Sequence, residues 1–232
     1  MIDVNKHRLY LVQILKDIYS DDKLAGCLGF KGGSALMFFY DLPRFSVDLD
    51  FNLICTDDKQ IISGKIRKIL LKYGRIHDEA AKLNTLLFVL DYRTGERKLK
   101  VEISTRNFED RYEIRDLLGL SMLVMNISDM FSHKLCALLE RNILAGRDIF
   151  DCWFLMKRQT PVNPIIIKKR GNMPLEDFLG KCIERIENVK NSIILQGIGE
   201  LIDEQIKNFV RKGLKEETIS LLKFYRDYPI TE

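Results

Sequence analysis

Long hydrophobic runs are missing from this sequence. A helix needs about 20 apolar residues to cross a bilayer, and no stretch approaching that length occurs here, so we expect no membrane span. The N-terminal segment MIDVNKHRLYLV also lacks the apolar core of a secretory signal peptide. Together, these two absences predict a cytoplasmic protein with no membrane partner.

Cysteine patterns typical of metal sites are missing as well. The sequence has five cysteines and three scattered histidines, but no Cys-x-x-Cys pair and no histidine pair near a cysteine. Apolar residues flank most of the cysteines, which predicts that all of them are free thiols in the core. They are Cys27, Cys55, Cys136, Cys152 and Cys182.

Neither sign of charge dominates. Lys and Arg number 37 and Asp and Glu 33, so the net charge is +4, which permits binding to a nucleic acid without requiring it. Hydrophobic residues make up 46% of the chain, and a substantial core is therefore expected. Low-complexity linkers and internal repeats are not found.

The hydrophobic periodicity changes along the chain. In the first half, some segments follow helical spacing and others alternate as strands do. Helices are expected at 4–19, 35–42 and 59–73, and strands at 27–30, 46–54, 86–92 and 98–105, the last two as a hairpin. From about residue 128 onward, nearly every segment has helical spacing, including one final stretch from 200 to 225. We therefore predict the α/β (α+β) class, with a mixed β-sheet flanked by helices in residues 1–125 and an α-helical region in residues 126–232.

Two aspartates interrupt the apolar strand at 46–54. Residues two apart on a strand share a face, so Asp48 and Asp50 project together while the apolar residues between them fill the core. Burying carboxylates without a compensating cation costs several kcal/mol or more. Mg²⁺ accepts a few carboxylates and keeps coordination sites for phosphate oxygens. The pair therefore favours a magnesium site in an enzyme that handles a triphosphate.

The turn before this strand has the composition of an anion site. Gly32 and Gly33 allow the backbone to approach a ligand closely, and Ser34 lies where a helix begins. Free N–H groups and the helix dipole favour anions at such a point. A tight turn without any ligand explains Gly-Gly-Ser equally well, and it is the combination with Asp48 and Asp50 that favours phosphate binding.

These residues match a known family. Gly33-Ser34 followed by Asp48-x-Asp50 resembles the signature of the DNA polymerase β-like nucleotidyltransferase superfamily. The longer stretch KGGSALMFFYDLPRFSVDLDF is similar to the first motif of AbiEii/AbiGii-type toxins, which combine Lys-Gly-Gly-[Ser/Thr]-Ala-Leu with Arg-x-Ser-x-Asp-x-Asp. The similarity continues through KLKVEIS and HKLCALLERNILAGRDIFDCWFL, to about residue 156. It implies that residues 1–125 form a nucleotidyltransferase core and that Lys31 joins the Gly-Gly-Ser turn in binding the nucleotide.

A third carboxylate is needed for two-metal transfer of this type, both to hold a metal and to take the proton of the attacking hydroxyl. Glu102 is the candidate, because alternation in KLKVEIST places it on the polar face of its strand. The family resemblance likewise implies a third acid on a later strand. A glutamate that simply faces solvent is the alternative.

Two helical motifs supply the remaining candidates. Lys134 lies in an apolar helical stripe, where a lysine can extend to water, but the resemblance implies a contact with the triphosphate of the incoming nucleotide. Arg147, Asp148 and Asp151 can share one helical face. They form either an intrahelical ion pair or, as the resemblance implies, an Arg-Asp-x-x-Asp motif of the active site. Because the acidic strands and these helices belong to different halves, we expect the site between the halves.

The resemblance also implies a bacterial toxin of a toxin–antitoxin or phage-defence pair, with an antitoxin as partner. We expect transfer of NMP from an NTP to an acceptor hydroxyl. Some relatives modify the 3′ end of tRNA, and the basic stretch KKR at 168–170 favours RNA as acceptor unless it is only a solvated face. A small molecule such as an antibiotic, a protein acceptor, and a catalytically silent binding module are the alternatives.

Overall fold

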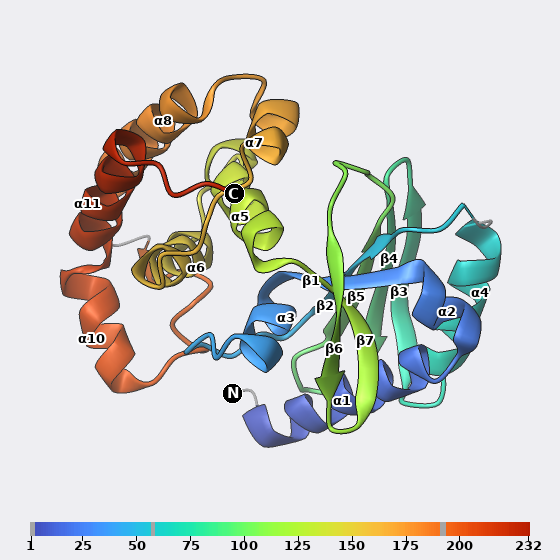
Figure 1. Cartoon of the computed structure of the whole chain (residues 1–232). Coiled ribbons are helices and arrows are strands. Elements are labelled where there is room, and N and C mark those ends of the chain that lie inside the picture. The colour runs from blue at the N-terminus through green and yellow to red at the C-terminus, as the bar shows by residue number, and fades with distance from the viewer. Residues whose placement is uncertain (1–2, 57–58, 191–193) are drawn as a thin grey trace. The chain divides into compact units, whose positions relative to one another are not determined.

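The structure is a computed structural model that describes residues 3–56, 59–190 and 194–232 (Figure 1). Its contacts divide the chain into two compact units. Unit 1 comprises Met1–Asp41, Phe45–Asn107 and Tyr112–Met125, and unit 2 comprises Leu42–Arg44, Phe108–Arg111 and Asn126–Glu232. Two short segments of the first half of the sequence therefore belong to the second unit.

Unit 1 is built on a mixed sheet, which within the described residues has seven strands in the order β3-β4-β5-β2-β1-β7-β6. Neighbouring strands are antiparallel except that β2 pairs with β5, and β1 with β7, in parallel. The strands are β1 (Leu28–Lys31), β2 (Leu49–Leu53), β3 (Arg75–Lys82), β4 (Thr85–Asp91), β5 (Leu99–Ser104), β6 (Tyr112–Leu117) and β7 (Leu120–Met125). The helices are α1 (Val4–Tyr19), α2 (Asp22–Cys27), α3 (Gly32–Phe39) and α4 (Lys59–Leu70).

The sheet has a core face and a polar face. In β5, Leu99, Val101 and Ile103 are buried. Lys100 and Glu102, which alternate with them, are exposed. This is the pattern of a strand with one face on the core and one toward solvent, and it sets which side chains of the central strands can reach a ligand.

The expected elements of unit 1 are confirmed where the periodicity is strong. The helix predicted at 4–19 is α1, and the predicted hairpin is the antiparallel pair β4 and β5. The pattern does not predict α2, β3, β6 or β7. Strands β3 and β6 are the two edges of the sheet, where little burial is available to impose alternation. Strand β7 is a short, mostly apolar run whose one polar residue, Ser121, is too little to show alternation.

Unit 2 is helical in its described residues. Its longer helices are α5 (Ile127–Glu140), α6 (Gly146–Lys157), α7 (Pro164–Gly171), α8 (Leu175–Glu187), α10 (Glu204–Lys212) and α11 (Leu214–Asp227). The side chain of Asn163 accepts a hydrogen bond from the N–H of Ile165 and so caps α7. The final helical stretch is divided at Gly213, because α10 ends there and α11 begins. In the part of the chain that the structure describes, no helix has the length and apolar character to cross a membrane.

The prediction of five free thiols is wrong for two cysteines. Cys27 and Cys55 form a disulfide, whereas Cys136, Cys152 and Cys182 are free and buried. The antiparallel pairing of β1 with β2 explains the bond, because the N–H of the residue before Cys55 donates to the carbonyl of Cys27 over 2.9 Å. Their separation of 28 residues hides this proximity in the sequence.

Candidate functional site

The three predicted acids lie on two neighbouring strands of unit 1. Strands β2 and β5 run in parallel, and their register pairs Asp50 directly with Glu102. Asp48 stands immediately before β2, two residues ahead of Asp50. Asp48 and Asp50 are half-buried and Glu102 is exposed. The parallel pairing therefore joins two carboxylates that are far apart in the sequence.

The chemistry of this set fits a magnesium ion. Mg²⁺ prefers oxygen ligands and is usually held by one or two protein carboxylates together with substrate phosphates. Among the residues that the structure describes, no three His, Cys, Asp or Glu side chains are gathered around one point as metal ligands. Neighbouring carboxylates repel each other when no cation lies between them, and this repulsion acts among Asp48, Asp50 and Glu102.

The backbone around Asp48 is anchored by two buried side chains. The hydroxyl of Ser34 donates to the carbonyl oxygen of Asp48. One residue earlier, Nε2 of His7 donates to the carbonyl of Val47 over 2.8 Å, and Nδ1 of His7 accepts from the hydroxyl of Tyr92 over 2.7 Å. Burial lowers the pKa of His7, and this keeps the ring neutral. The sequence pattern does not single out His7 among the three scattered histidines, because the partners of its ring are brought near only in the folded chain.

The Gly-Gly-Ser turn lies against the acids. Gly32 begins α3 with a φ of +80°, and a Cβ atom placed on it would lie 2.5 Å from Oδ2 of Asp50. Lys31 pairs with Asp50 across β1 and β2. Ser34 is fully buried, and its hydroxyl is already bonded to Asp48. The groups of this turn that could bind an anion are therefore the first-turn N–H groups of α3.

Replacing Gly32 with alanine is expected to damage the site in two ways. The left-handed backbone costs an alanine about 1–2 kcal/mol, and the added methyl group displaces the carboxylate of Asp50. We expect a loss of nucleotidyl transfer of about 100-fold, because a catalytic group moved by about 1 Å has this effect. Steady-state transfer assays and thermal unfolding measure the two effects separately.

Gly64→Ala is the matched control. Gly64 lies within α4, and nothing stands within 4 Å of a Cβ placed on it. Alanine there should raise stability by up to about 1 kcal/mol and leave transfer unchanged. Equal activities of the two variants would contradict the assigned contact between Gly32 and Asp50.

A buried charge cluster holds the predicted residues of unit 2. Asp151 of α6 is fully buried, and Arg44 donates to its two oxygens from Nε and Nη2 over 2.6 and 2.7 Å. Nζ of Lys134 lies 2.7 Å from Oδ2 of the same carboxylate. Burial raises the pKa of Asp151, but the charges of Arg44 and Lys134 outweigh it and lower that pKa to about 2. Asp151 is therefore a carboxylate held between two cations.

The other two residues of the Arg-Asp-x-x-Asp motif have separate surroundings. Asp148 is buried, and its Oδ2 lies 2.6 Å from Nε of Arg141. Arg147 is half-buried, and no ion pair of Arg147 is found within the described residues. The intrahelical pair between Arg147 and Asp151 considered from the sequence does not form here, because Asp151 is bonded to Arg44 and Lys134 instead.

Comparison with known proteins places the chain in a family. The family described as "Nucleotidyl transferase AbiEii toxin, Type IV TA system" matches residues 13–218. The chain belongs to this family. The resemblance seen in residues 31–51 is confirmed, and this AbiEii-family protein is a nucleotidyltransferase of the toxin–antitoxin type. Family membership also implies an antitoxin partner and a nucleotide substrate.

Solved structures support the fold of this AbiEii-family nucleotidyltransferase. JHP933 from Helicobacter pylori superimposes with a TM-score of 0.63 at 20% identity, over 97% of this chain and 92% of that one. A second H. pylori protein, provisionally described as a nucleotidyltransferase, gives a TM-score of 0.64 at 20% identity, over 97% of this chain and 95% of its own. No curated protein matches by sequence.

The basic stretch of this AbiEii-family protein at 168–170 is partly neutralised. Lys169 forms an ion pair with Glu109. Arg170 pairs with Glu140 and donates to Nδ1 of His133. Cations bonded to acids offer less charge to an RNA backbone than three solvated cations would. The KKR stretch therefore gives only weak support to an RNA acceptor.

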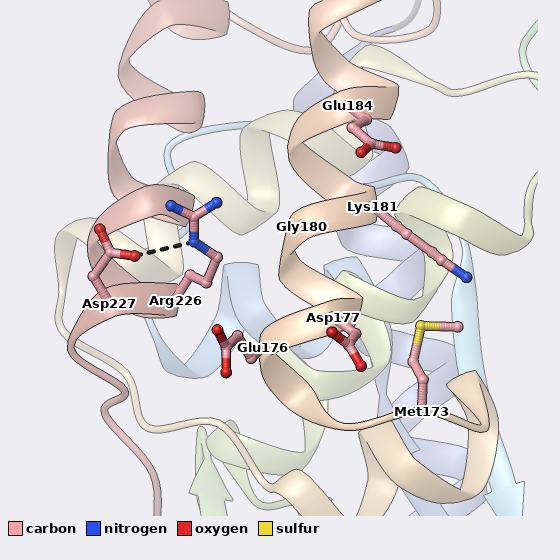
Figure 2. Close-up of a pocket in the computed structure, with 8 residues that line it drawn as sticks. All are labelled: Met173, Glu176, Asp177, Gly180, Lys181, Glu184, Arg226 and Asp227. Atoms are coloured by element: carbon pink, nitrogen blue, oxygen red, sulfur yellow. Dashed lines mark hydrogen bonds and ion pairs between the residues drawn. The ribbon is translucent and has the colours of Figure 1, made fainter.

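A hollow of about 600 Å³ in unit 2 of the AbiEii-family protein is lined by none of the predicted site residues. It is lined by α8 and the end of α11, where Arg226 pairs with Asp227 (Figure 2). Its charged lining holds more acids than bases: Glu176, Asp177, Glu184 and Asp227 against Lys181 and Arg226. Such a lining repels phosphates, so we do not assign the nucleotide to this hollow.

Proposed function

We propose that this AbiEii-family nucleotidyltransferase transfers NMP from an NTP to a hydroxyl of RNA, with tRNA as the preferred acceptor and Mg²⁺ as cofactor. The pairing of Asp50 with Glu102 beside Gly32 carries the proposal. The acceptor oxygen forms a bond to the α-phosphorus, the bond from that phosphorus to the β-phosphate bridging oxygen breaks, and pyrophosphate leaves. The proton of the acceptor hydroxyl passes to a carboxylate.

In this proposal, the three acids and the start of α3 in unit 1 each have a role in the reaction. Mg²⁺, when bound by Asp48, Asp50 and Glu102, would neutralise the charge of the phosphates. Glu102 is the exposed acid of the three, and it takes the proton of the acceptor hydroxyl. The N–H groups at the start of α3 bind phosphate oxygens through the positive end of the helix dipole.

Unit 2 supplies cations in the proposal. The ammonium of Lys134 has three donors, and the contact with Asp151 leaves donors for a nucleotide phosphate. We assign Arg147 to phosphate as well, since it is half-buried and without an ion pair among the described residues. Asp151 and Asp148 assist by holding Lys134 and Arg141 in place.

The choice of RNA rests on charge and on the family. The net charge of +4 is compatible with a polyanionic acceptor, and a toxin that modifies tRNA stops translation in the host cell. We propose that this arrest serves defence against phage. A small molecule such as an antibiotic, or a protein hydroxyl, remains the competing acceptor for the same chemistry.

Transfer of labelled nucleotide tests the proposal. The protein is incubated with Mg²⁺, total bacterial RNA and each NTP labelled at the α-phosphate, and both RNA labelling and pyrophosphate release are measured. We expect one NTP to label RNA of tRNA length. Release of pyrophosphate without labelled RNA would show that the acceptor is not RNA but a small molecule or a protein. NTP binding that persists without Mg²⁺ and releases no pyrophosphate would make the protein a binding module.

A further inference from the structure

Tyr112 stands on the edge strand β6, yet its ring covers a central strand. A Cβ atom placed on Gly29 of β1 would lie 2.1 Å from the ring of Tyr112, so the ring lies directly over the backbone at Gly29. Its hydroxyl accepts a hydrogen bond of 2.7 Å from Nδ2 of Asn52 on β2. Gly29 and Asn52 are paired across β1 and β2. The ring is therefore fixed both by the backbone beneath it and by its hydroxyl.

This ring lies on the face of the sheet that carries the acids. Asn52 follows Asp50 by two residues on β2, so the two side chains share a face about 6.6 Å apart along the strand. Asn52, which is bonded to the Tyr112 hydroxyl, is only 3% exposed, while Tyr112 itself is partly exposed. The ring therefore occupies the space next to Gly29, on the side of the sheet to which Asp50 and Asn52 project.

We propose that the ring of Tyr112 is the stacking platform for the base of the NTP, an inference that rests on the proposed function. A base stacks on an aromatic face whatever its sequence identity, and a platform beside the carboxylates serves a ligand whose phosphates lie at those carboxylates. Asn52 is the positioning residue, since its hydrogen bond holds the ring across the sheet. Glycine at position 29 is required because any side chain would occupy the space of the ring.

Binding of an NTP and of its base-free analogue tests the platform. Titration calorimetry of the full chain with Mg²⁺ compares each NTP with ribose 5-triphosphate. We expect the wild type to bind the preferred NTP at least about tenfold more tightly than the analogue, as stacking of one base predicts. Tyr112→Ala should abolish this difference and leave the affinity for ribose 5-triphosphate unchanged.

Two further variants separate stacking from folding. Tyr112→Phe keeps the ring and should retain most of the preference for NTP, within about threefold. Tyr228→Ala removes an exposed tyrosine of unit 2 and should change neither affinity. Thermal unfolding of each variant reports whether the fold is retained.

The outcomes distinguish this inference from the proposed function. If the wild type binds the NTP and the analogue equally, or Tyr112→Ala keeps the NTP preference, the platform is wrong and the proposed function stands. If Tyr112→Ala loses affinity for the NTP and for ribose 5-triphosphate to the same extent, the ring has a structural role only and the platform is wrong. If that variant raises only the KM for RNA, the ring serves the acceptor and the assignment to the NTP is wrong. If the wild type binds neither ligand, the proposed function fails and the platform with it.

Discussion

Asp48→Asn is expected to reduce nucleotidyl transfer at least about 1000-fold while the protein remains folded. Asparagine has the shape of aspartate but lacks its charge, so it neither holds Mg²⁺ as strongly nor balances a metal in the transition state. Ser34 donates a hydrogen bond to the main-chain carbonyl of Asp48, and His7 donates one to the main-chain carbonyl of Val47. The substitution changes only a side chain and preserves both bonds. Labelling of RNA with α-labelled NTP measures the loss, and circular dichroism reports the fold.

Asp78→Asn is the control for this variant. Asp78 is an exposed aspartate on the edge strand β3. Its cross-strand partner is Val89, which is not a predicted site residue. Its replacement removes the same charge from the same unit and should leave transfer within about twofold, as surface substitutions usually do. If Asp48→Asn were as active as Asp78→Asn, the assignment of Asp48 to the reaction would be wrong.

Asp151→Ala is expected to lower the free energy of unfolding by about 3–5 kcal/mol. Removing one partner of a buried ion pair leaves the other charge buried without compensation, and here the side chain of Arg44 is only 3% exposed. Urea unfolding followed by circular dichroism measures the change. Transfer activity should fall as well, since Lys134 loses its partner.

The double variant Arg44→Met with Asp151→Leu separates charge from packing. Replacing a buried pair with apolar side chains of similar volume is often neutral or stabilising, so the double variant should recover most of the stability lost in Asp151→Ala. A double variant as unstable as the single one would show that the exchange of Arg44 for methionine brings no relief, so that packing or the charge of Lys134, left without its carboxylate, dominates at this position.

Stability should also fall in acid, in a defined window. The pKa of Asp151 is about 2 in the folded protein, below its ordinary value of 3.8. A carboxyl group whose pKa is lowered by folding contributes stability above its unfolded value, and that contribution is lost as the pH falls from about 4 to about 2. Urea unfolding of wild type and the double variant across this range should show the extra loss only in wild type.

Much of the fold follows from local pattern. Residues 4–19 form α1 as helical spacing predicts, and residues 86–92 and 98–105 correspond to the β4 and β5 hairpin. Alternation also predicts that the side chains of Asp48 and Asp50 share a face, and this stays a prediction, because Asp48 lies immediately before β2 rather than within it. The edge strands β3 and β6 escaped prediction because exposed strands carry little hydrophobic alternation.

The amino-acid sequence by itself determined the family, the acid pair and the turn that precedes it, because each of these lies within one short stretch. Only the tertiary structure decided which distant residues meet. It pairs Asp50 with Glu102 through parallel strands, joins Arg44 to Asp151 across 107 positions, closes the disulfide between Cys27 and Cys55, and lays the ring of Tyr112 over β1. The physical reason is that these contacts depend on strand order and on core packing of the whole unit, and no local segment encodes its partner.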